Sequence, residues 1–143
     1  MNENRNGRGR KHILFSLKIA AVMIGGALLL TWARKQGWAD HDLVMRGYNV
    51  IMGLALAAYG NALPKLMHET PPRSIHEATL AQAVARVTSW VMTLAFLTWA
   101  ALWAFAPLDI AKVGSMLAVG AGAVGVLAYT ARKGYACRAS RTD

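Results

Sequence analysis

Four long apolar blocks dominate the sequence and constrain its fold more than any other feature. They occupy residues 13–33, 43–63, 84–106 and 108–131. As an α-helix rising 1.5 Å per residue, each is long enough to cross a hydrocarbon core of about 30 Å. The chain is only 16% charged, whereas soluble domains contain roughly 25% charged residues. We therefore predict one all-α integral membrane domain over residues 1–143, a bundle of four transmembrane helices.

Prolines and capping residues mark the predicted helix boundaries. Pro64 should end the second helix, because proline lacks an amide hydrogen and restricts the residue before it. Ser74 and Glu77 form a capping-box pattern, which predicts that the third helix begins near Ser74. Pro107 should end the third helix, and Asp109 should lie at the start of the fourth.

The net charge of +9 is concentrated in two basic tails, residues 1–12 and 132–143. With four spans, the tails and the middle loop share one side of the membrane. That side carries most of the basic residues: Arg5, Arg8, Arg10, Lys11, Lys65, Arg73, Arg86, Arg132, Lys133, Arg138 and Arg141. The other side carries Arg34, Lys35, Arg46 and Lys112. The positive-inside rule then predicts a multi-pass membrane protein with both termini in the cytoplasm.

The basic tails are expected to contact anionic lipids and not nucleic acid, because basic ends beside apolar spans act as orientation signals. Lys18 lies inside the first span, close enough to its cytoplasmic end to reach the headgroups. Trp32 and Trp38 at the outer end of the first helix fit an aromatic belt, as do Trp99 and Trp103 near the outer end of the third.

Small residues recur at helical spacing in two of the spans. Lipid tails are as apolar as leucine, so close backbone approach has to hold membrane helices together. The predicted packing residues are Gly53, Ala57 and Gly60 in the second helix and Gly114, Ala118 and Gly122 in the fourth. Ala121 and Gly125 form a further pair of small residues. Packing of several copies of the chain through such a stripe is an alternative that the sequence leaves open.

Arg46 and Asn49 are polar residues within the second span, on the same helix face as Gly53. A guanidinium in hydrocarbon is costly, so Arg46 should turn inward, reach outward to the headgroups, or pair with a carboxylate. Asp42 lies at the favourable spacing of four residues. A ligand or ion contact near the outer mouth is the functional alternative.

A second polar cluster is predicted at the cytoplasmic end of the second helix. There the Asn61 amide is expected to satisfy carbonyls left free where Pro64 ends the helix. Arg86 should approach the same membrane surface from the third helix, which would complete a cluster of Asn61, Lys65 and Arg86.

The sequence contains no pattern typical of an enzyme, a cofactor site or a metal site. It lacks a nucleophile elbow, a glycine-rich phosphate loop and a haem-binding cysteine pair. The histidines lack the close spacing of metal ligands, although His68 and His76 share the middle loop region with Glu69 and Glu77, which leaves a weak site open.

The stretch Gly60-Asn61-Ala62-Leu63-Pro64-Lys65 resembles the Gly-Asn-x-x-Pro-Lys motif of the SdpI-like family of small bacterial membrane proteins. The family includes immunity proteins against secreted peptide toxins, some of which also signal through a cytoplasmic repressor. The resemblance implies an immunity or sensor function, with Asn61, Pro64 and Lys65 as motif residues of unknown role.

Three functions are therefore compatible with the sequence. The preferred one is a non-catalytic accessory or scaffolding subunit that packs against a larger membrane assembly, with another membrane protein or a second copy as its partner. The alternatives are an immunity or sensor protein of the SdpI-like type and a small oligomeric transporter or channel.

Overall fold

The computed structural model describes residues 3–66 and 75–139. Within these ranges only the backbone is described for residues 3–9, 11–12, 63, 65–66, 75–78, 80 and 135–139.

The chain is all-helical over the described residues, as predicted. The helices are α1 (Glu3–Lys35), α2 (His41–Leu66), α3 (Ile75–Phe105) and α4 (Leu108–Ala139). Each contains a stretch long and apolar enough to cross a membrane: Ile13–Lys35, His41–Ala62, Ala81–Phe105 and Leu108–Gly134. These four stretches indicate a multi-pass membrane protein.

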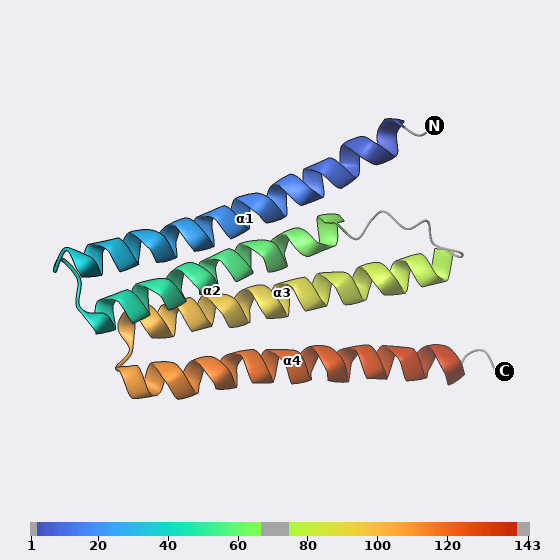
Figure 1. The fold of residues 1–143 in the computed structure, drawn as a ribbon. Coiled ribbons are helices and arrows are strands. Elements are labelled where there is room, and N and C mark those ends of the chain that lie inside the picture. Colours follow the sequence, from blue (N-terminus) through green and yellow to red (C-terminus); the bar gives the residue numbers. More distant parts are fainter. Residues whose placement is uncertain (1–2, 67–74, 140–143) are drawn as a thin grey trace.

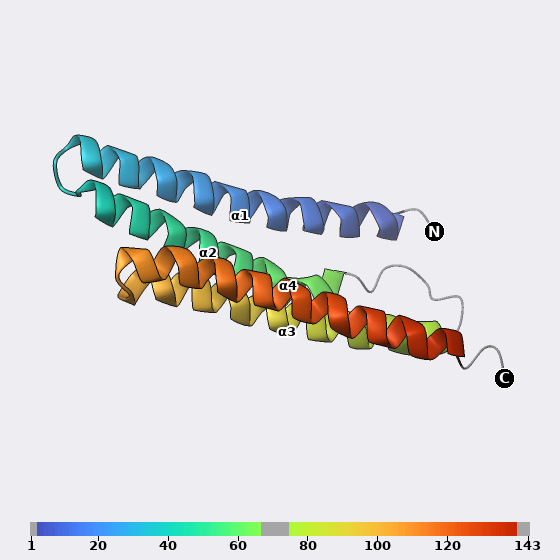
Figure 2. The same cartoon turned by 90° about the horizontal axis from the view of Figure 1, so that it is seen from below.

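The helices run alternately up and down as an open bundle in chain order, with α1 and α4 at its two edges (Figure 1, Figure 2). Among the described residues, each helix contacts only its neighbours in the chain, and the largest contact joins α2 to α3. The N-terminal end of α1 and the C-terminal end of α4 lie at the same end of the molecule (Figure 1). We call this the tail end and the opposite end the hairpin end.

The connection between α1 and α2 satisfies both helix termini. At the end of α1, the Gly37 amide donates to the Arg34 carbonyl and the Trp38 amide to the Ala33 carbonyl, both at 3.0 Å. Gly37 adopts the left-handed conformation (φ 75°) that this termination motif needs. Asp40 then caps α2 by accepting a hydrogen bond of 2.7 Å from the Leu43 amide.

Two of the predicted boundaries are confirmed and one is wrong. Helix α3 begins at Ile75, next to Ser74, and ends at Phe105, before Pro107. The capping contacts predicted for Ser74 and Glu77 lie outside the described side chains. Helix α2, however, passes through Pro64 and ends at Leu66. The Ser89 hydroxyl of α3 replaces the hydrogen bond to the Gly60 carbonyl that the proline removes.

Both predicted small-residue stripes lie against α3. A Cβ placed on Gly53 would be 3.1 Å from the backbone nitrogen of Ala100, and one placed on Gly60 would be 3.3 Å from the Thr93 hydroxyl. Ala57, between these glycines, is buried. Only small residues allow α2 and α3 to approach this closely.

On the other side of α3, the stripe of α4 makes the corresponding contacts. A Cβ on Gly114 would be 3.1 Å from Leu102, and one on Gly122 would be 3.2 Å from the Ala95 methyl. Ala118, between the two glycines, is half-buried. Helix α3 is therefore held between two glycine-containing faces, whereas α1 and α4 each contact a single helix among the described residues.

Candidate functional site

The hairpin end contains a polar contact between α2 and α3, built around the carbonyls that end α3. Pro107 has no amide hydrogen, so it cannot donate to the Trp103 carbonyl four residues earlier. The Arg46 guanidinium of α2 supplies donors instead. Its Nη1 lies 2.8 Å from the Ala106 carbonyl and 3.4 Å from the Trp103 carbonyl. Arg46 thereby caps the C-terminus of the neighbouring helix.

This geometry decides between the predicted environments of Arg46. The side chain is half-buried and turns inward. Its hydrogen bonds go to the backbone carbonyls of Trp103 in α3 and of Ala106 just after α3, and not to the exposed Asp42. A positive charge at the C-terminus of a helix also interacts favourably with the helix dipole. Asn49, one turn further along, donates to the Met45 carbonyl of its own helix at 2.9 Å.

Trp103 extends this contact to α4, and its predicted place in an aromatic belt is wrong. Its side chain is only 6% exposed, and its indole Nε1 donates to the Ser115 hydroxyl at 3.3 Å. Ser115 is fully buried and donates to the Lys112 carbonyl at 3.1 Å. Trp103 is buried because α4 folds back over it after Pro107, a contact that no property of the α3 sequence alone indicates.

A second contact of the same kind lies towards the tail end. Pro64 cannot donate to the Gly60 carbonyl, four residues before it in α2. The buried Ser89 hydroxyl of α3 donates to this carbonyl at 2.7 Å. The sequence suggested Asn61 for this role, and Ser89 was missed. The sequence signal that could have identified Ser89 is a serine in one apolar helix together with a glycine and a proline four residues apart in the helix before it.

The predicted cluster of Asn61, Lys65 and Arg86 is not assembled by the described side chains. Asn61 and Arg86 are both exposed, and no hydrogen bond joins them in the described part of the chain. The Lys65 side chain lies outside the described residues, as do the side chains of the histidine and glutamate pairs at 68–69 and 76–77.

The two contacts join neighbouring helices, and both side chains donate to backbone carbonyls. Each places a donor from one middle helix on a proline-freed carbonyl of the other, with Arg46 acting from α2 and Ser89 from α3. Over the described residues, no group of three or more His, Cys, Asp or Glu side chains could hold a metal ion. Comparison with models of protein families, with curated proteins and with solved structures finds no match to this chain.

Replacing Arg46 tests the cap on α3. Arg46→Met should lower the free energy of unfolding in mixed micelles by about 1–2 kcal/mol, because the carbonyls of Trp103 and Ala106 lose their donor. Arg46→Lys should restore part of this loss. Asp42→Asn is the control and should change stability by less than about 0.5 kcal/mol. Unfolding is followed by tryptophan fluorescence. An equal loss in Asp42→Asn would mean that the carboxylate, and not the cap, stabilises Arg46.

A double-mutant cycle tests the pairing of Ser89 with Pro64. Ser89→Ala should cost about 1 kcal/mol, because the Gly60 carbonyl is left buried without a donor. In a Pro64→Ala background the same substitution should cost almost nothing, since the new amide at position 64 can donate to Gly60 within the helix. Additive effects in the cycle would contradict this role for Ser89.

Proposed function

We propose that this chain is a non-catalytic accessory or scaffolding subunit that packs against a helix of a larger membrane assembly. The observation that carries the proposal is a second small-residue face on α4. Gly114 and Gly122 already contact α3, whereas Ala121, Gly125 and Ala128 are exposed. Nothing lies within 4 Å of a Cβ placed on Gly125. This face therefore has room for a close helix approach that the chain itself does not use.

The edges of the open bundle support the same function. In α1, none of the most apolar membrane-spanning window is buried inside the protein. In α4, the large side chains beside the small face are exposed, with Leu117 at 67% and Leu127 at 70%. Both edge helices therefore offer whole apolar faces to their surroundings, as a small subunit needs if it is to sit between lipid and a larger partner.

The alternative functions have less support. The polar side chains that a transporter or channel would use, Arg46 and Asn49, are engaged with backbone carbonyls. Of the residues that carry the SdpI-like resemblance, Gly60 and Pro64 take part in a helix–helix contact through Ser89, which is a structural use of the motif.

Two matched glycine substitutions test whether the free face of α4 binds the partner. A tagged chain is purified from its native membrane in mild detergent, and its companions are identified by mass spectrometry. A stoichiometric companion is expected. Gly125→Leu should reduce its recovery by about tenfold, because the added side chain blocks close approach. Gly25→Leu is the matched control, since Gly25 also has nothing within 4 Å but lies on α1, and it should leave recovery unchanged.

The possible results separate the proposal from its alternatives. A companion that is a second, differently tagged copy would identify the assembly as a homo-oligomer. A wild-type chain that purifies alone as a monomer would overturn the subunit function. Equal losses in Gly125→Leu and Gly25→Leu would overturn the assignment of the partner to α4.

We also propose that both termini lie in the cytoplasm of a bacterial cell, with the chain in the inner membrane. Support comes from the common position of the two tails (Figure 1) and from the exposed Arg10, Arg132 and Lys133 at that end. Alkaline phosphatase, which is active only outside the cytoplasm, should be inactive when fused after Asp143 and active when inserted between Gly37 and Trp38. The reverse pattern would invert the topology.

A further inference from the structure

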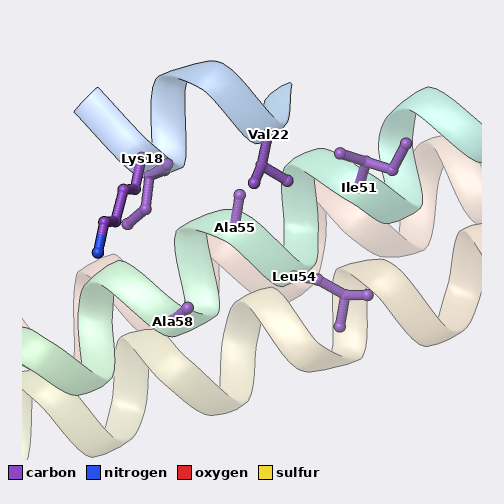
Figure 3. A pocket seen from close by; sticks show the side chains of 7 residues that line it. Lys18, Val22, Ile51, Leu54, Ala55 and Ala58 are labelled. Atoms are coloured by element: carbon purple, nitrogen blue, oxygen red, sulfur yellow. The ribbon is translucent and has the colours of Figure 1, made fainter. Parts of the chain in front are cut away.

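A groove opens between α1 and α2 on the tail side of their contact, with a volume of about 340 Å³ (Figure 3). Its wall on α1 includes Lys18 and Val22, and its wall on α2 includes Ile51, Leu54 and Ala58. Apart from the Lys18 amine, the side chains that line it are aliphatic. Ligand sites of small molecules begin at roughly this volume.

The groove exists because α1 touches α2 closely only towards the hairpin end. There, a Cβ on Gly47 would be 3.1 Å from Leu30, and one on Gly26 would be 2.7 Å from Ile51. From this contact α1 diverges from α2 towards its N-terminus (Figure 2). The methyl groups of Ala55 and Ala58 are too short to fill the widening space, so the groove stays open at the side.

Charge distinguishes the two ends of the groove. Lys18 lies at its tail end and extends from α1 towards α2 near Ala58, whereas Ile51 lies at the other end (Figure 3). Lys18 has no hydrogen bond or ion pair within the described part of the chain. The acidic side chains described are Asp40, Asp42 and Asp109, all near the hairpin end. The Lys18 amine therefore lies at the open end of an apolar groove, with no described acidic side chain near it.

We propose that this groove binds one anionic phospholipid, with the headgroup phosphate on the Lys18 amine and one acyl chain along Val22 and Leu54. A lysine near the membrane surface attracts anionic headgroups, and an apolar slot facing hydrocarbon is filled by an acyl chain more readily than by water. From Lys18 to Gly26 the helix rises about 12 Å, close to the roughly 15 Å depth of one leaflet's hydrocarbon. This site is independent of the partner face on α4.

Native mass spectrometry of the full-length chain in mild detergent tests the headgroup contact. The chain is titrated with phosphatidylglycerol and, separately, with phosphatidylcholine. Wild type should retain one phosphatidylglycerol more tightly than phosphatidylcholine, and Lys18→Gln should weaken this tightest site about fivefold. Lys112→Gln removes an exposed lysine near the hairpin end and should leave the site unchanged. Equal affinity in Lys18→Gln and wild type would overturn the proposal.

A second pair of variants tests the contact of the acyl chain with the groove without changing the charge of the protein. Ala58→Phe places a ring in the groove from the exposed side of α2 and should abolish the tightest site for both lipids. Ala101→Phe adds the same ring at an exposed position of α3, outside the groove, and should have no effect. Retention of the site in Ala58→Phe would place the lipid on the basic tails and overturn the proposal. So would equal loss in both variants, since it would reflect general destabilisation.

Discussion

In a membrane interior, where water is scarce, every backbone carbonyl needs a donor from the protein itself, and this requirement shapes the middle of the molecule. Pro64 and Pro107 each remove one donor from a helix. The resulting gaps are filled across the same interface but in opposite directions: α3 supplies the Ser89 hydroxyl to Gly60, and α2 supplies the Arg46 guanidinium to Trp103 and Ala106. An unsatisfied carbonyl is costly in this environment, so the two contacts favour one register between α2 and α3.

The two polar contacts depend on close helix packing between them. Gly53 lies between Arg46 and Gly60 along α2, and its contact with Ala100 brings the two backbones together. A larger residue there would move Arg46 and Ser89 away from their acceptors together. The pair α2–α3 therefore forms the most extensive helix contact among the described residues, and α1 and α4 are attached to it on opposite sides. Their outer faces are free for the subunit partner and the lipid that we propose.

Local pattern was sufficient for the helices and for the faces of α2 and α4 that meet a neighbour. Apolar length predicted four spans, and the spacing of Gly53, Ala57 and Gly60 predicted one packing face, because both depend only on helical periodicity. The polar site was less predictable. Arg46 was identified as a residue needing a partner, but the partner is a pair of carbonyls on another helix, and backbone acceptors leave no mark in a sequence. Ser89 and Ser115 were missed for a related reason, since a single serine in an apolar span has no periodic signal.

The sequence by itself determined that the chain has four helices suited to lipid, where most of them begin and end, and which stripes are small enough to pack. These properties follow from composition, helical repeat and local capping. Only the tertiary structure decided that both stripes face α3, that α2 continues through Pro64, and that Trp103 is buried under α4. Each of these depends on which helices become neighbours, and a buried donor or acceptor acquires its role only from the residue that is brought to it.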